Sequence, residues 1–192
     1  MAGKQSRTIA KVELPPDQPW SQLAGFSAAT IPALFVERCQ RTPHKVAFRV
    51  KEMGIYREVT WREYLEHVEN LCLGLVELGL KPGDRVAIMG DTRPEWSYAD
   101  LATQCAGGIS LGIYSTSSLL ELQYLMEDAG AKFFVAEDQE YVDKILALAA
   151  ELPQLKKIIV ADTKGLFMYG DSRLMSFKEV EKIGSQRKAQ GL

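Results

Sequence analysis

The sequence lacks several features that would narrow its function at once. It has only two histidines and three cysteines, and they form no Cys/His cluster, which argues against a metal site. Its 23 basic and 25 acidic residues give a net charge of −2, so no positive excess predicts nucleic-acid binding. No apolar run approaches the ~20 residues that span a bilayer. These absences favour a soluble globular protein without a transmembrane segment.

Cysteine usage and the start of the chain predict a cytoplasmic protein. Cys39, Cys72 and Cys105 are odd in number, widely spaced, and each lies in a helical pattern. We expect them to be reduced thiols that face the core. The first seven residues are followed by no apolar h-region, so no secretory signal peptide is predicted.

The chain divides into an arm and an α/β unit. Residues 1–28 include Pro15, Pro16 and Pro19 and show no hydrophobic periodicity, which predicts an extended N-terminal arm. Residues 29–192 are predicted to form the α/β unit. Its last helix ends in a polar stretch, residues 186–190, and no closing element follows. We therefore expect an incomplete subdomain that continues beyond residue 192.

The stretch from residue 60 to residue 114 alternates helix and strand. Thr60 and Glu63 form a capping-box pattern that begins a helix. The apolar stripe of this helix comprises Trp61, Tyr64, Leu65, Val68, Cys72, Leu75 and Val76. His67 lies off the stripe and is expected to be a solvated surface histidine. A strand at 85–89, a helix at 95–106 and a strand at 109–114 then predict a parallel pair with a right-handed crossover.

The remaining segments extend this pattern. Thr30 begins a helix whose predicted buried side is Leu34, Phe35 and Cys39. The other predicted elements are a hairpin at 46–50 and 56–60, helices from Ser118, Asp138 and Ser176, strands at 132–136 and 157–161, and a loop at 162–171. Four strands alternating with helices predict an open, doubly wound, mostly parallel α/β sheet flanked by helices. The small N-terminal β-hairpin is expected at an edge or in a side sheet.

Few candidate catalytic or binding residues follow the carboxyl ends of the predicted strands, where such sheets bind ligands. The sequence has no G-x-G-x-x-G, no P-loop and no G-x-S-x-G. Asp91 and Arg93 are best interpreted as a helix cap with a nearby charge pair. Tyr114, Ser115 and Thr116 place hydroxyls at a strand end, where they could line a substrate channel or simply serve a turn and a helix cap.

Several short motifs occur in an order that resembles a known family. They are Thr60-Trp61-x-Glu63-Tyr64, Gly79-Leu80-x-Pro82-Gly83-Asp84-Arg85-Val86-Ala87-Ile88, Arg93-Pro94-Glu95-Trp96, Ala106-Gly107-Gly108, Gly112-Ile113-Tyr114-Ser115-Thr116 and Glu121-Leu122-x-Tyr124. This pattern resembles the N-terminal region of AMP-forming acyl-CoA synthetases of the adenylate-forming superfamily. Within it, the residues at 94–96 and 112–116 look most like the long-chain fatty-acid branch.

The resemblance implies an activity for a longer protein. Such an enzyme activates a fatty acid with ATP and Mg²⁺ to an acyl-adenylate and then transfers the acyl group to CoA. The family's phosphate loop and catalytic lysine have no matching positions here, so no catalytic, cofactor-binding or metal-binding residue is assigned. Tyr114, Ser115 and Thr116 would form part of the acyl channel. Peripheral membrane contact and a homodimer are compatible with the resemblance.

The expected role of the chain itself is that of a scaffold, inactive alone. The alternative, from a different class, is a stand-alone, non-catalytic α/β binding or interaction module.

Overall fold

The structure, a computed structural model, describes residues 29–191. The predicted arm, residues 1–28, lies outside the described residues. Within them, none of the helices combines the length and the apolar character that crossing a membrane requires.

The described elements follow the predicted order closely. They are α2 (Ile31–Arg41), β1 (Val46–Glu52), β2 (Ile55–Thr60), α3 (Trp61–Glu77), β3 (Arg85–Met89), α4 (Pro94–Cys105), β4 (Ile109–Ile113), α5 (Leu119–Ala129), β5 (Phe133–Ala136), α6 (Gln139–Ala147), β6 (Lys157–Val160), the 3-10 turn η1 (Leu166–Met168), β7 (Leu174–Ser176) and α7 (Phe177–Ala189). The sequence predicted a sheet of four strands and omitted β7, because three residues are too few to show an alternating pattern. The predicted loop also contains the short η1 turn.

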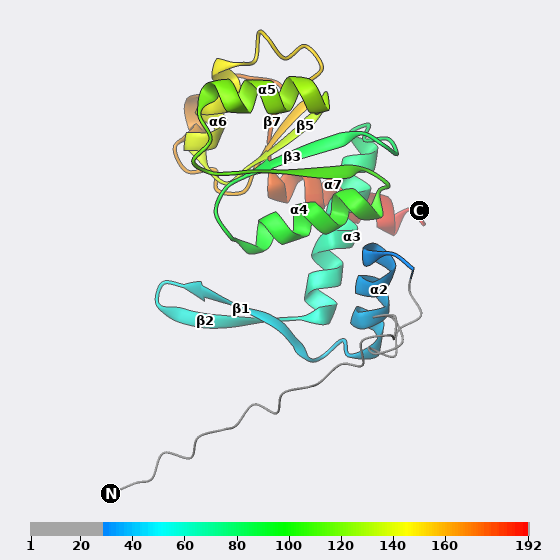
Figure 1. The fold of residues 1–192 in the computed structure, drawn as a ribbon. Helices are drawn as coiled ribbons and strands as arrows, with labels where there is room; N and C mark the ends of the chain where they lie inside the picture. The colour runs from blue at the N-terminus through cyan, green and yellow to red at the C-terminus, as the bar shows by residue number, and fades with distance from the viewer. Residues whose placement is uncertain (1–28, 192) are drawn as a thin grey trace, which may run out of the picture.

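The main sheet has five parallel strands in the order β4-β3-β5-β6-β7. Strands β1 and β2 form a separate antiparallel hairpin, which leads into the N-terminal end of α3 and extends away from the main sheet (Figure 1). The predicted α/β class with a parallel sheet and a side hairpin is confirmed.

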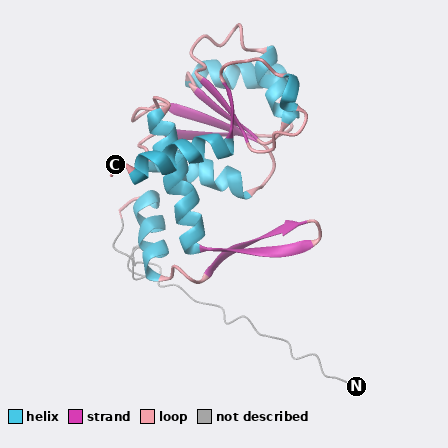
Figure 2. Cartoon of the chain, turned by 180° about the vertical axis from the view of Figure 1, so that it is seen from behind, coloured by secondary structure: helices cyan, strands magenta, loops and turns pink. Residues whose placement is uncertain are grey.

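Helices cover both faces of the main sheet, so that two cores form (Figure 2). The central strand β5 shows the division, because Phe133 packs into the core beneath α3, α4 and α7, while Phe134 packs into the core beneath α5 and α6. Both side chains are fully buried. Successive residues of a strand point to opposite faces, so a continuous apolar run is what a doubly covered strand needs.

The predicted helix starts are confirmed in atomic detail. Thr60, Ser118 and Ser176 each accept a hydrogen bond from the backbone amide three residues later, and the glutamate at that position bonds back to the cap amide. These boxes satisfy donors that a helix start would otherwise leave unpaired. They fix the starting residues of α3, α5 and α7.

Helix α3 is covered on more sides than its stripe predicts. Leu71, which the predicted stripe omits although it lies three residues after Val68 and four before Leu75, is fully buried. Helix α7 also packs against α3. Gly74 and Gly184 allow this approach: a Cβ on Gly184 would lie 1.7 Å from the backbone oxygen of Asn70. Two expectations of burial are wrong, since Val76 is 48% exposed and Leu34 is 39% exposed. Both lie where no described element covers the helix.

The cysteines also differ from the expectation. All three are free thiols, but only Cys39 is buried; Cys72 is half-buried and Cys105 is exposed. Burial raises the pKa of Cys39 and of Cys72 to about 11, so neither thiol ionises readily at neutral pH. The prediction that all three face the core is therefore wrong for Cys105, which lies in the last position of α4.

An ion pair fixes the amino-terminal end of the main sheet. The Lys132 ammonium lies 2.6 Å from a carboxylate oxygen of Asp84, and the Lys81 amide donates to the other oxygen at 3.1 Å. The hydrogen bond from Lys132 lowers the pKa of Asp84 below its ordinary 3.8. The pair joins the turn before β3 to the start of β5.

We expect Asp84→Asn to reduce the free energy of unfolding at neutral pH by about 2 kcal/mol, because the charge-assisted hydrogen bond is lost. Because the folded-state pKa of Asp84 lies below 3.8, its contribution is present above that pH and is lost as the pH falls through the folded value. Urea unfolding at several pH values measures this. Asp128→Asn, at an exposed carboxylate, is the control and should change stability by less than about 0.5 kcal/mol. An equal effect of the two substitutions would contradict the assignment.

Candidate functional site

A cleft lies at the carboxyl end of the main sheet. Its volume is about 890 Å³. Its walls are the hairpin β1–β2, one side of α3, the loop before α4, and the first turns of α4 and α7. This is the edge where parallel sheets bind ligands.

The loop between β3 and α4 is fixed by Glu137, the residue after β5. One carboxylate oxygen of Glu137 accepts from the Asp91 amide at 2.6 Å, and the other accepts from Arg93 at 3.3 Å. Gly90 permits this approach, since a Cβ there would lie 2.6 Å from the Cβ of Glu137. Glu137 thus belongs to the loop before α4, while Asp138 caps α6 by accepting from the Glu140 amide.

The predicted cap at Asp91 is wrong. The N-cap of α4 is Arg93, and no side chain caps the first amides of the helix. Arg93 does form the expected charge pairs, with Glu95 at 3.4 Å and Glu137 at 3.3 Å. Pro94, which has no amide hydrogen, occupies the first helical position, one residue before the predicted start of the helix.

His67 forms part of the cleft wall rather than a freely solvated surface. Its ring stacks on Tyr98 with centroids 4.6 Å apart and planes at 6°, and its Nδ1 lies 2.6 Å from Oε1 of Glu181 in α7. The hydrogen bond with Glu181 raises the pKa of His67 above 6.5, against the opposite effect of burial. The expectation of a solvated histidine is corrected, because the imidazole joins α3 to α7 although 42% of the side chain remains exposed.

We expect Glu181→Gln to lower the pKa of His67, because burial then acts without the opposing carboxylate. A folded pKa above 6.5 means that the pair stabilises the fold fully below about pH 6.5, and that this contribution is lost as the pH rises through the folded pKa. An NMR titration of the His67 ring measures the shift. Glu77→Gln removes another carboxylate of α3, one that pairs with Arg187 of α7, and should leave the His67 pKa unchanged. An unchanged His67 pKa in Glu181→Gln would contradict the pairing.

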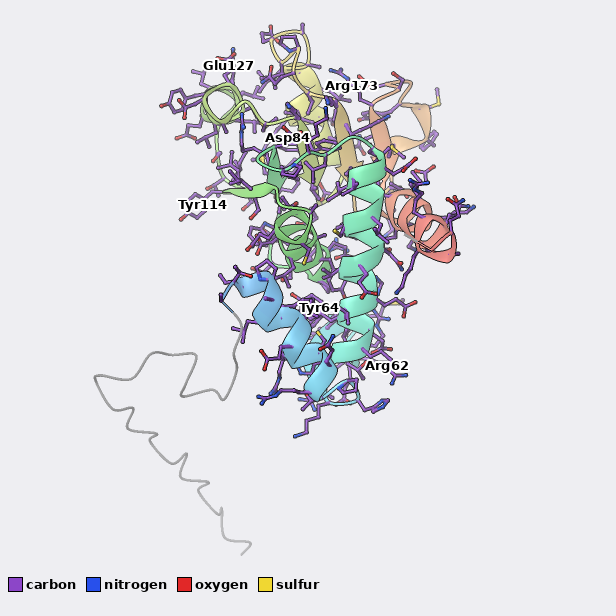
Figure 3. The ribbon with its side chains drawn as sticks, turned by 90° about the vertical axis from the view of Figure 1, so that its right-hand side faces the viewer. Arg62, Tyr64, Asp84, Tyr114, Glu127 and Arg173 are labelled. Carbon is purple, nitrogen blue, oxygen red and sulfur yellow. The ribbon has the colours of Figure 1, made fainter. Side chains whose placement is uncertain are left out.

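The hydroxyls predicted to line a channel lie outside the cleft. Tyr114, Ser115 and Thr116 follow β4 at the edge of the main sheet, and none of them lines the 890 Å³ cleft. Tyr114 is 84% exposed and points away from the molecule on the side opposite α7 (Figure 3). The Ser115 carbonyl accepts from Lys144 at 3.3 Å, which links this turn to α6.

The glycine at 112 has a packing role. A Cβ on Gly112 would lie 3.1 Å from the Trp96 ring, so the edge strand β4 lies close to the start of α4.

Sequence reasoning missed most of the cleft. His67 and Glu181 are 114 positions apart, and the hairpin wall comes from a third region, so no local motif connects them. The described residues contain no group of three or more His, Cys, Asp or Glu side chains that could hold a metal ion.

Comparisons with known proteins agree on one family for this chain. A sequence model of the family described as "AMP-binding enzyme" matches residues 35–187. Over 139 residues, 72% of this chain, the sequence is 32% identical to the long-chain-fatty-acid–CoA ligase ACSBG2 of Xenopus laevis. It is 31% identical over 131 residues, 68% of this chain, to the human long-chain-fatty-acid–CoA ligase ACSBG1. The matched regions are 19% and 18% of these relatives, so the chain spans about a fifth of their length.

The solved structures agree with the fold. The coronafacic acid ligase of Pectobacterium brasiliense superposes with a TM-score of 0.69 at 16% identity, over 79% of this chain and 29% of that one. Because the family model matches residues 35–187, which are most of the chain, the chain belongs to the AMP-binding enzyme family.

Proposed function

We propose that this chain is the N-terminal part of an AMP-forming acyl-CoA synthetase that acts on long-chain fatty acids. The complete enzyme would join a fatty acid to ATP, with Mg²⁺, to give an acyl-adenylate and pyrophosphate, and CoA would then displace AMP. The observation that carries the proposal is the 31–32% identity to long-chain-fatty-acid–CoA ligases over about two thirds of the chain. We further propose a cytoplasmic location.

In this proposal the chain supplies scaffold and no catalytic residue. Transfer of a nucleotide requires cationic groups and a metal ion placed together around the phosphates. The described cleft instead contains ion pairs that are internal to the chain, such as Arg93 with Glu95 and His67 with Glu181. The structural role is the one that the buried cores, the capped helices and the parallel sheet support.

Tyr114, Ser115 and Thr116 remain the proposed substrate-contacting residues. Their position beyond the carboxyl end of β4 is typical of ligand contacts in parallel α/β sheets. The exposed Tyr114 ring offers an apolar surface to an acyl chain. In the complete enzyme, Tyr114→Ala should raise the KM for palmitate, whereas Tyr124→Ala, at a 64% exposed tyrosine of α5, should not.

The test of the function is thioester formation by the complete polypeptide that contains this sequence. With ATP, Mg²⁺ and CoA, we expect palmitoyl-CoA to form with a higher kcat/KM than octanoyl-CoA or benzoyl-CoA. A preference for octanoate or benzoate would overturn the long-chain assignment, and no thioester with any acid would overturn the ligase assignment. In that last case the alternative, a non-catalytic α/β binding module, would account for the fold.

A further inference from the structure

Strand β4 forms one edge of the main sheet, and its outer side is unpaired. Among the residues that the structure describes, β4 pairs with β3 alone. The Ile109 amide donates to the Asp84 carbonyl at 2.9 Å, on the β3 side. The backbone groups of a strand alternate in direction, so the odd-numbered residues of β4 bond to β3, while Ser110 and Gly112 point outward. Two residues of β4 thus present amides and carbonyls with which no described strand pairs.

The other edges of the described sheets are protected against pairing with a second chain. Charged side chains, prolines and short strands are the usual protection of an edge. The hairpin strands carry Arg49, Lys51, Arg57 and Glu58, and β7 has only three residues. By contrast, no residue from 101 to 120 is charged or a proline, and β4 lies within this stretch. The composition of β4 therefore favours pairing with another strand.

The surface next to this edge is apolar. Ile109, Leu111 and Ile113 point to the face covered by α5 and α6, because Leu111 and Ile113 pack into the core on that face. Their burial decreases toward the start of the strand: Ile113 is buried, Leu111 is half-buried, and Ile109 is 55% exposed. The helices of that face therefore leave the start of β4 uncovered. Apolar surface beside an unpaired edge is typical of a protein interface.

Two exposed apolar side chains of α5 face the same way. Leu120 and Tyr124 lie four residues apart and share one side of the helix with Glu127, three residues further on. Figure 3 shows Glu127 and Tyr114, the residue after β4, on the same side of the molecule, opposite α7. A partner that meets the edge of β4 therefore approaches this apolar side of α5 as well.

We propose that β4 pairs with β4 of a second copy of this chain, antiparallel and about a twofold axis at Leu111. This register pairs all five residues of the strand. Ser110 of each copy lies opposite Gly112 of the other, so that their outward backbone groups exchange hydrogen bonds. Ile109 lies opposite Ile113, and the two Leu111 side chains meet on the axis. The contact is self-complementary, as a twofold dimer requires.

A second copy fits this edge better than a charged peptide does. The uncharged stretch from 101 to 120 offers no opposite charge to an acidic or basic partner, and joining two such stretches brings no like charges together. On the α4 face the paired residues are small, namely Gly112 and Ser110, whose hydroxyl donates to Asp100 of α4. The pairing is independent of the ligase activity proposed above, because it uses only the described strand and its surroundings.

The test is sedimentation velocity of the purified 192-residue chain at increasing concentration. We expect the mass to rise to twice the 21.4 kDa of one chain. Ile109→Lys places on β4 the charge with which natural edges resist pairing, and it should weaken the dimer at least about tenfold. The matched control is Ile55→Lys, at an exposed isoleucine of the hairpin strand β2, which should leave the dimer unchanged. A chain that stays monomeric, or equal weakening by the two substitutions, would overturn the proposal.

Disulfide cross-linking tests the register without relying on a destabilised edge. The background is Cys105→Ser, which removes the exposed native thiol. In this background Leu111→Cys should form a covalent dimer with oxidised glutathione, because Cα atoms of a non-hydrogen-bonded antiparallel pair lie about 4.5 Å apart. The control is Ile109→Cys, since in this register the two copies of position 109 are offset by about 13 Å along the strand. Equal cross-linking of the two variants would contradict the pairing.

Amide exchange measured by NMR distinguishes a second copy from a segment of the same chain. In the dimer the amides of Ser110 and Gly112 should be protected, and dilution to the monomer should remove that protection. Protection that persists in the monomer would mean that the chain covers its own edge. That result would overturn the second copy as the partner of β4.

Discussion

Gly184→Ala is expected to destabilise the protein by about 3 kcal/mol, because the added methyl group meets backbone rather than a flexible side chain. The Cβ would lie 1.7 Å from the Asn70 oxygen and 2.8 Å from the Gly74 nitrogen, both in α3. Alanine favours a helix over glycine by about 1 kcal/mol, which is too little to offset the displacement of α7. Urea unfolding followed by circular dichroism measures the change.

The matched control is Gly170→Ala, in the loop before β7. A Cβ there meets nothing within 4 Å, so the substitution should change stability by less than about 0.5 kcal/mol. If Gly184→Ala were as stable as Gly170→Ala, the close contact between α3 and α7 would be wrong. The placement of α7 in the cleft wall would then be wrong as well.

Phe133→Ala and Phe134→Ala are each expected to cost about 4 kcal/mol, the range for removing a buried aromatic ring from a core. These neighbouring side chains fill different cores, one on each face of the main sheet. Similar losses at both positions would follow from a sheet that is covered on both sides. Denaturant unfolding of the two variants tests this directly.

Phe167→Ala provides the comparison, because this ring is 87% exposed on the η1 turn. Its loss should change the free energy of unfolding by less than about 0.5 kcal/mol. A small effect at either Phe133 or Phe134 would mean that one face of the sheet is open. That result would contradict the three-layer arrangement.

Most of the fold could be predicted from the sequence because its signals are local. The capping boxes at Thr60, Ser118 and Ser176 mark helix starts, and apolar runs such as 133–136 mark buried strands. β7 could not be predicted, since a three-residue strand is defined by its pairing with β6 and not by its own pattern. The close approach of Gly74 to Gly184 could not be predicted either, because these glycines lie 110 positions apart in the chain.

The candidate site could be predicted only in part. The sequence indicated the carboxyl ends of the strands, and Thr92 and Arg93, in the loop after β3, do line the cleft. The contribution of the hairpin and the pairing of His67 with Glu181 depend on how distant elements pack together. Tyr114, Ser115 and Thr116 remain a prediction, because the structure places them outside the cleft without testing contact with a substrate.

The central claim is that this chain is the scaffold of an AMP-forming ligase and carries no catalysis of its own. The most direct measurement is the exchange of labelled pyrophosphate into ATP by the purified 192-residue chain, with Mg²⁺ and palmitate present. A complete ligase of the same family, assayed in parallel, shows that the conditions permit exchange. The account predicts no palmitate-dependent label in ATP from the isolated chain. Palmitate-dependent label above the enzyme-free background would contradict it.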